Sequence, residues 1–244
     1  MGRPTDAMKS FVLRLPPKAQ AAIRHVSNPA FVEVNARYSF SQEGEDLLVG
    51  RVFDGQETGF YVDVGAHHPT RFSNTCLLYR KGWSGINIDP MPGSMALFDK
   101  ARPLDTNLEL AISSTPGSVT LTVFDETALN TLSPERRQYL DESTDYTVNR
   151  EVEVTAATLE TVLLEHLPPG TTIDLLTVDV EGLDFDVLQS NDWDQFRPRV
   201  LLIEVLDTRL DELDGRPEIQ YLRERGYRVD AKLFNTVLLL DDRA

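Results

Sequence analysis

Apolar residues along the chain gather in short blocks that alternate between the spacing of strands and the spacing of helices. Four β-branched and leucine-rich runs, "GFYVDVGA", "SGINID", "DLLTVDVEG" and "RVLLIEVL", predict strands. Around them, "SFSQEGEDLLVGRVF", "FSNTCLLYRKG", "TLETVLLEHL" and "FDVLQSND" predict helices. This alternation is typical of an α/β domain built on a mostly parallel sheet.

Residues at the ends of these blocks predict where helices begin and end. Ser41 is a favourable N-cap for the helix before the first strand, and Ser73 or Asn74 for the helix after it. Gly82 is expected to end that second helix, because glycine readily adopts the left-handed conformation found at helix C-termini. Near the C-terminus, "IQYLRERGYRVDAKLFNTVLLLDD" predicts a helix and two strands, which must be antiparallel because their connection is so short.

Two segments depart from this alternation. Residues 1–40 mix proline, charge and short apolar patches, with one amphipathic stretch at 18–26. We expect them to form an N-terminal arm before a single domain over 41–244. Residues 125–150 are polar and rich in turn formers. Long irregular insertions in compact domains commonly serve as lids or binding loops, and we expect that role here.

Charge and cysteine content limit the partners and the compartment. The formal net charge of −15 would repel the phosphates of nucleic acids and of anionic lipid headgroups. No run of residues approaches the ~18 apolar positions of a membrane span. The single cysteine, Cys76, lies in an apolar run and cannot form an intrachain disulfide. We therefore expect a cytoplasmic protein that acts neither on nucleic acid nor across a membrane.

Acidic residues close several of the predicted strands. Asp63, Asp89, Asp179 and Glu204 fall at or near carboxyl ends, which meet at one edge of a parallel sheet, where ligands bind. Gly65 would let the backbone turn sharply and approach a ligand. One glycine followed by His-His-Pro lacks the G-x-G-x-x-G pattern, so the loop fits a nucleoside cofactor better than NAD or FAD. Asp89 could accept hydrogen bonds from both hydroxyls of a ribose.

Six motifs occur in order along the chain: "SQEGEDLL", "YVDVGAHHPTRFSNT", "GWSGINIDPMP", "ARPLDTNLELAISS", "LNTLS" and "LLTVDVEGLDFDVL". In this order they resemble the FkbM family of S-adenosylmethionine-dependent methyltransferases over about residues 38–240. The resemblance implies a Rossmann-like class I methyltransferase fold, with a seven-stranded, mostly parallel sheet, an antiparallel last strand and helices on both faces. It also implies O-methylation of a hydroxyl on a small-molecule or glycosylated acceptor, such as a sugar, glycolipid or natural product.

The resemblance also implies which residues bind the cofactor. The set expected to bind S-adenosylmethionine is Gln42, Asp63, Val64, Gly65, Ala66, Ser73, Asn74, Asp89, Ala111, Ile112 and Asp179. Within it, Asp89 would hold the ribose, Ala111 and Ile112 would flank the adenine, and Gln42 would close the pocket. The chain departs from the commoner "GAN-x-G" form by having His-His-Pro at 67–69.

Methyl transfer to a hydroxyl requires alignment of the acceptor oxygen with the methyl group and a base that takes the proton. His68, and less directly His67, could be that base because histidine titrates near neutral pH. Asp179 and Glu181 share a parity on an extended segment and could face one pocket together with Glu204. His68 and these three carboxylates are the candidate catalytic residues.

Neighbouring acidic and polar residues leave alternatives open. Asp179, Glu181 and Glu204 could hold Mg²⁺, which prefers hard oxygen ligands, whereas Asp184 and Asp186 more ordinarily complement a helix dipole. No cysteine or histidine spacing indicates structural zinc. The residues of the 125–150 segment that could hydrogen-bond a polyol, or could simply be solvated, are Asn130, Thr131, Arg136, Arg137 and Tyr139.

Two other functions stay open on the residues alone. A nicotinamide-dependent oxidoreductase could use a similar sheet, although the missing second and third glycines argue against it. A non-catalytic module could keep the nucleoside pocket and lack transfer chemistry. Neither fold nor cofactor identifies the acceptor, and the sequence does not fix the oligomeric state.

Overall fold

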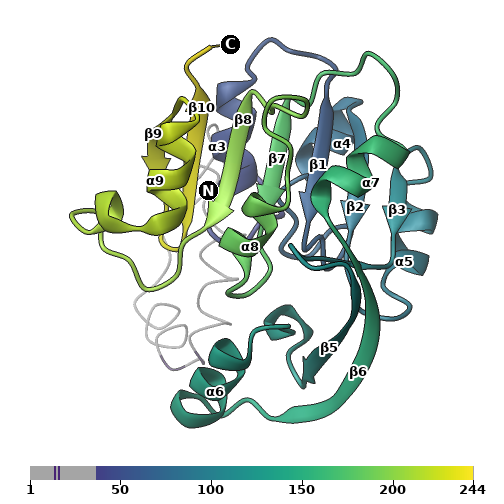
Figure 1. The fold of residues 1–244 in the computed structure, drawn as a ribbon, viewed down its shortest axis with the longest axis vertical. Coiled ribbons are helices and arrows are strands. Elements are labelled where there is room, and N and C mark those ends of the chain that lie inside the picture. The colour runs from purple at the N-terminus through teal and green to yellow at the C-terminus, as the bar shows by residue number, and fades with distance from the viewer. Residues whose placement is uncertain (1–13, 15, 17–36, 244) are drawn as a thin grey trace. The chain divides into compact units, whose positions relative to one another are not determined.

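The strand-forming runs pair into one seven-stranded sheet in the computed structural model, which describes residues 14, 16 and 37–243 (Figure 1). The order across the sheet is β3-β2-β1-β7-β8-β10-β9. The strands are β1 (Phe60–Val64), β2 (Ser84–Ile88), β3 (Thr106–Leu108), β7 (Leu175–Val178), β8 (Val200–Glu204), β9 (Tyr227–Lys232) and β10 (Thr236–Asp241). Strand β10 runs antiparallel to β8 and β9, and the other pairs are parallel. The predicted sheet with its antiparallel last strand is confirmed.

The predicted N-terminal arm lies almost entirely outside the described residues. Of residues 1–40 the structure describes 14, 16 and 37–40, and the amphipathic stretch at 18–26 is not among them. From Ser39 onward the chain belongs to one compact unit. Within the part of the chain that is described, no helix combines the length and the apolar character that crossing a bilayer requires.

Helices cover both faces of the sheet because alternate strand residues point to opposite sides (Figure 1). The helices are α3 (Glu45–Val52), α4 (Cys76–Lys81), α5 (Met95–Ala101), α7 (Leu159–His166), α8 (Asp184–Gln189) and α9 (Pro217–Glu224), with a short 3-10 turn η2 (Leu213–Gly215). Val62 and Val64 of β1 pack in a core cluster with residues of α7, α8 and α9. Tyr61 of the same strand packs in a second cluster with Val49 of α3 and Leu78 of α4.

The helix ends differ in part from those expected. The N-cap of α3 is Gly44 and not the predicted Ser41. The helix starts later, and the Ser41 hydroxyl accepts the N–H of Asp46 at 3.2 Å and donates to its carboxylate at 2.9 Å. At the end of α4, Gly82 has the expected left-handed conformation, with φ 105°.

A second sheet of three strands carries the insertion. It consists of β4 (Ala111–Ile112), β5 (Gly117–Phe124) and β6 (Val148–Ala157), in the order β4-β6-β5. The polar composition of the 125–150 segment predicts an irregular insertion, but the structure contains regular elements between β5 and β6. It contains the turn η1 (Thr127–Leu129) and helix α6 (Pro134–Ser143). Helix α6 forms because Pro134 fits its first turn and the Ser133 hydroxyl accepts the N–H of Arg136 at 3.1 Å.

Gly65 joins the ends of β1 and β7 through close backbone packing. Its φ is 85°, in the left-handed region, and an added Cβ would lie 1.7 Å from the carbonyl oxygen of Asp179. The N–H of Asp179 in turn donates to the carbonyl of Val64 at 3.0 Å. Glycine is therefore required here for contact between two strands, and not only for approach to a ligand.

We expect Gly65→Ala to destabilise the protein far more than Gly55→Ala. Both glycines have positive φ, but a Cβ at Gly55 would meet nothing within 4 Å. The Gly55 variant should therefore lose only the ~1–2 kcal/mol of left-handed strain, whereas the Gly65 variant must also separate β1 from β7. Urea unfolding of both variants measures the difference, and equal losses would contradict the packing role.

Candidate functional site

A cavity of about 330 Å³ opens where β1, β2 and β7 end. This volume lies within the range of small-molecule sites, ~300–1,000 Å³. Residues that line it include Val64, Gly65, His67, His68, Asp89, Met91, Leu97, Leu110, Ala111, Ile112, Leu121, Asn130, Leu132, Asp179 and Glu181. The predicted edge of the sheet is thus hollow, and the insertion contributes one wall of it.

Asp89 presents a carboxylate with spare hydrogen-bonding capacity. Its Oδ2 accepts the N–H of His67 at 3.0 Å, and its Oδ1 accepts the N–H of Met91 at 2.9 Å. Each carboxylate oxygen can accept about two hydrogen bonds, so each keeps one free position. The side chain is buried, and burial raises its pKa. A pair of hydroxyl donors would fit this carboxylate.

Apolar side chains form the wall beside Asp89. Ala111 and Ile112 come from β4, as predicted for the residues that flank the adenine, and both line the cavity. Met91, Leu110 and Leu132 add to this wall, and sequence reasoning did not single them out. The wall supplies an apolar environment suited to an aromatic base.

Four of the residues predicted to bind the cofactor lie behind the cavity wall. The Asp63 carboxylate points toward α4 and accepts the hydroxyl of Thr75 at 2.6 Å. Ala66 packs against α5. The Ser73 hydroxyl caps the first N–H of α4, and the Asn74 amide donates to Thr177 at 3.1 Å. Ser73 and Asn74 were the two N-cap residues predicted for α4, but the N-cap in the structure is Thr75. Asp63, Ala66, Ser73 and Asn74 therefore support the loop from beneath.

Arg102 organises this supporting layer and was missed from the sequence. Its side chain is buried, and its guanidinium donates to the Thr75 and Ser73 hydroxyls and to the carbonyl of Pro69. Burial raises the pKa of Asp63 to about 6, although the Thr75 hydrogen bond and the Arg102 charge oppose this rise. No local sequence pattern distinguishes this arginine from a solvated one.

A smaller hollow of about 60 Å³ adjoins the cavity and shares Gly65, His67, Asp179 and Glu181 with it. We call it the acidic chamber. Its remaining walls include Gln42, Glu43, Glu45, Phe72, Glu204 and Asn235. Gln42, predicted to close the pocket, thus borders the chamber and not the larger cavity.

Asp179, Glu181 and Glu204, here called the acid cluster, lie together in this chamber. One carboxylate oxygen from each lies within 4.8 Å of the others. Asp179 follows β7 and Glu204 ends β8, and the pairing of Val178 with Ile203 brings the next residues of the two strands side by side. The enclosing walls and the neighbouring carboxylates raise the pKa of Asp179 and of Glu204 well above their usual values, although Asp179 keeps accessible surface within the hollows.

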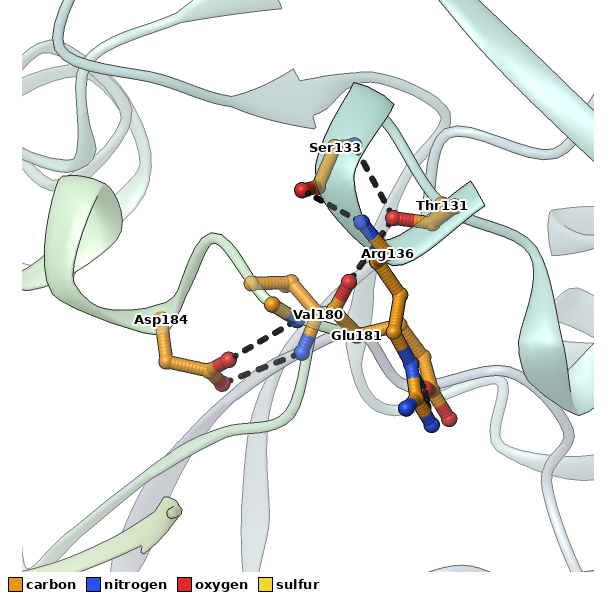
Figure 2. Close-up of polar contacts among 7 residues, drawn as sticks. Thr131, Ser133, Arg136, Val180, Glu181 and Asp184 are labelled. Carbon is orange, nitrogen blue, oxygen red and sulfur yellow. Dashed lines mark hydrogen bonds and ion pairs between the residues drawn. The ribbon is translucent and has the colours of Figure 1, made fainter. Parts of the chain in front are cut away.

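Partners are distributed unequally within the acid cluster. Glu181 pairs with Arg136 of α6, whose Nη2 lies 2.8 Å from its Oε2 (Figure 2). Among the described residues, Asp179 and Glu204 have no hydrogen-bonding or ion-pairing partner for their carboxylates, and Oε2 of Glu204 is fully buried. The accessible surface of Asp179 faces the two hollows. The cluster thus contains one neutralised and two unpaired carboxylates.

The family model for the methyltransferase FkbM domain matches residues 63–229, more than half of the chain. The chain belongs to the FkbM methyltransferase family. Membership makes the protein a methyltransferase, and S-adenosylmethionine is the methyl donor that this membership implies. The cavity fits that donor in two respects, since Asp89 offers a carboxylate for a ribose and Ala111 and Ile112 offer an apolar wall for an adenine.

Comparison with solved structures finds two further methyltransferases that are similar to the FkbM domain. A precorrin-6y C5,15-methyltransferase from Geobacter metallireducens GS-15 has 12% identity and a TM-score of 0.43, over 84% of this chain and 93% of that one. An O-methyltransferase from Bacillus cereus in complex with SAH has 12% identity and a TM-score of 0.33, over 97% of this chain and 91% of that one. A comparison with curated proteins finds no match.

The two adjacent histidines of the first loop, His67 and His68, have little capacity to act as bases. His68 Nδ1 accepts the backbone N–H groups of Thr70 and Arg71, at 3.1 and 3.0 Å. In the neutral ring the proton therefore lies on Nε2, which leaves His68 without a free acceptor nitrogen. Burial lowers the pKa of both rings, that of His67 to about 4, and the positive charge of Arg71 adds to this. The geometry argues against the prediction that His68 is the base.

We expect Glu204→Gln to stabilise the FkbM domain at pH 8. Because the pKa of Glu204 is raised in the folded state, stability falls as pH rises from the ordinary pKa of a glutamate toward that raised value. At higher pH the folded protein must hold an ionised, unpaired carboxylate beside Asp179. The amide removes this repulsion, and a gain of 1 kcal/mol corresponds to a rise of about 2–4 °C in a chain of this size.

Differential scanning calorimetry at pH 5 and pH 8 tests this expectation. The gain should shrink at pH 5, because the raised pKa leaves less of the wild-type carboxyl ionised at the lower pH. Glu57→Gln serves as the control, because the Glu57 side chain is exposed and makes no hydrogen bond or ion pair with the described residues; it should change the melting temperature at neither pH. Destabilisation by Glu204→Gln at pH 8 would contradict the unpaired state of this carboxylate.

Proposed function

We propose that the protein is an S-adenosylmethionine-dependent O-methyltransferase that methylates a hydroxyl of a sugar, glycolipid or natural product. One observation carries this proposal: the cavity that would hold the adenosyl group adjoins the acidic chamber and shares Gly65, Asp179 and Glu181 with it. A ligand in the cavity would thus lie next to carboxylates able to accept a proton. We also expect activity in the cytoplasm, on the strength of the single cysteine.

The cofactor would extend from the apolar wall to the shared rim. Ala111 and Ile112 would contact the adenine and Asp89 the ribose, while Val64 and Gly65 would border the methionine part. When bound, the cofactor supplies an electrophilic methyl group on a sulfonium. Gln42 and Phe72, on the far wall of the chamber, would then contact the acceptor.

Within this arrangement the protein aligns the acceptor and removes its proton. A carboxylate of the acid cluster would take up the proton that the acceptor hydroxyl loses when it receives the methyl group, and the demethylated cofactor would leave as S-adenosylhomocysteine. Asp179 and Glu204 suit this role better than Glu181, because neither has a partner among the described residues. A carboxylate with a raised pKa is also a stronger base than an ordinary one.

The acid cluster fits a Mg²⁺ ion poorly. A magnesium site needs hard oxygen ligands in nearly octahedral geometry. Arg136 already donates through Nε and Nη2 to Oε2 of Glu181, so a cation held by all three carboxylates would adjoin a guanidinium. We therefore propose metal-independent proton removal.

The nicotinamide alternative has little support. Membership in the FkbM family and the single glycine of the first loop both weigh against a pyrophosphate-bearing cofactor. A non-catalytic module would bind S-adenosylhomocysteine but transfer no methyl group to any acceptor. Transfer and binding assays therefore separate these functions.

We expect S-adenosylhomocysteine to bind, and Asp89→Ala to weaken the binding by about 10- to 150-fold. This range corresponds to the ~1.5–3 kcal/mol of a lost charge-assisted hydrogen bond. Isothermal titration calorimetry measures both affinities, with the exposed Asp99→Ala as control. Unchanged affinity in Asp89→Ala would exclude the ribose role, and absence of binding to the wild type would exclude the methyltransferase proposal.

We expect methyl transfer to persist after removal of metals. Protein dialysed against EDTA is incubated with labelled S-adenosylmethionine and a panel of oligosaccharides, glycolipids and natural products, with and without added Mg²⁺. Equal transfer in both arms supports a carboxylate base. Transfer that requires Mg²⁺ would instead assign the acid cluster to a metal.

A further inference from the structure

The loop after β7 holds Glu181 in an unfavourable backbone conformation. Glu181 has φ 54° and Gly182 has φ 101°, so two successive residues are left-handed. A non-glycine residue in this region costs about 1–2 kcal/mol, and surrounding contacts must therefore hold it there. Because Glu181 belongs to the acid cluster, these contacts determine where one of its carboxylates lies.

From the helix side, Asp184 secures the loop. Its carboxylate accepts the N–H of Val180 and the N–H of Gly182, both at 3.2 Å (Figure 2). This arrangement fixes the backbone on either side of Glu181. Asp184 does not contact the side chain or the carbonyl of Glu181, so other residues must hold these two groups.

The insertion provides the remaining contacts. The Thr131 hydroxyl donates to the carbonyl of Glu181 at 2.7 Å, and Arg136 donates to its carboxylate through Nε at 3.0 Å and Nη2 at 2.8 Å (Figure 2). Arg136 and Glu181 are each only 13% exposed, so solvent screens this pair weakly. A Cβ on Gly182 would come within 3.3 Å of Arg136 Cβ, which shows how closely α6 packs on the loop.

The part of the insertion that makes these contacts is itself well anchored. Thr131 pairs with Thr122 of β5 through two backbone hydrogen bonds, at 2.9 and 3.1 Å. The Thr131 hydroxyl also accepts the N–H of Ser133, and the Ser133 hydroxyl accepts the N–H of Arg136. Arg136 thus projects from a capped first turn that is tied to a long strand.

We propose that Arg136 is a positioning residue for methyl transfer and that the insertion, which lines the cavity and reaches the acidic chamber at Ala128, is a fixed wall of the site instead of a mobile lid. Arg136 holds the Glu181 carboxylate against α6 and is engaged by it, which leaves Asp179 and Glu204 unpaired in the acidic chamber. The inference rests on the proposed function, because it assigns the acid cluster to the acceptor.

The next residue along the helix provides a matched control. Arg137 lies on the same turn of α6 and also pairs with carboxylates, Glu151 and Asp141. Its side chain is 42% exposed and does not line the cavity or the chamber. Loss of Arg137 removes a charge and a pair of similar kind without reaching the loop.

Steady-state kinetics and calorimetry of Arg136→Ala, Arg136→Lys and Arg137→Ala test the proposal. We expect Arg136→Ala to lower kcat/KM for the acceptor by about 100-fold, the effect of a ~1 Å misplacement, with S-adenosylhomocysteine affinity within about twofold of wild type. Arg136→Lys should recover part of this loss, and Arg137→Ala should match wild type. Adding Arg136→Ala to Glu181→Gln should cost little further, because the two side chains act as a unit.

Opposite results would overturn the proposal. These are wild-type kinetics in Arg136→Ala, or fully additive losses in the double variant. If the wild type transfers no methyl group, the proposed function fails, and hydrogen exchange then tests the positioning alone. Amides of residues 180–183 should exchange faster in Arg136→Ala than in Arg137→Ala, and equal rates would overturn the role of Arg136.

Discussion

The contact between Gly65 and the carbonyl of Asp179 is the constraint on which the site depends. The N–H of Gly65 donates to Ile88 at the end of β2, while Asp179 donates to Val64 at the end of β1. These hydrogen bonds extend the pairing of the three strands past their ends. They bring the carbonyl of Asp179 so close to residue 65 that no side chain fits there. Because of this contact, the cavity on the β2 side and the acid cluster on the β8 side share one rim.

Negative charge is concentrated at this shared rim, and only some of the carboxylates there have hydrogen-bonding or ion-pairing partners. Asp184 is satisfied by two backbone N–H groups and Glu181 by a guanidinium, whereas Asp179 and Glu204 face each other without a partner among the described residues. Like charges in a partly desolvated hollow oppose folding at neutral pH. Their retention where the acceptor would bind is the kind of local conflict that marks a functional site.

Strand patterns were sufficient to predict the sheet, its antiparallel final strand and the convergence of the acidic residues. The same patterns did not lead to the correct direction of the Asp63 side chain or to strand β6. Asp63 shares its parity with Tyr61, which faces α3 and α4, so period-two alternation already places its side chain beneath the cavity. Strand β6 also alternates, with Val152, Val154 and Ala156 packed inward, but the charged residues between them hid this pattern.

Other parts of the site depend on tertiary contacts that no local pattern contains. Arg102 is buried only because the Ser73 and Thr75 hydroxyls and the carbonyl of Pro69 converge on it. The partnership of Arg136 with Glu181 joins residues that are 45 positions apart. The polar residues of the 125–150 segment divide by partner, which their sequence does not reveal. Asn130 and the neighbouring Leu132 line the cavity, whereas Thr131 and Arg136 face the loop of the acid cluster. One insertion therefore borders both halves of the site through different side chains, so substitutions that alter the acceptor half need not disturb the cofactor half.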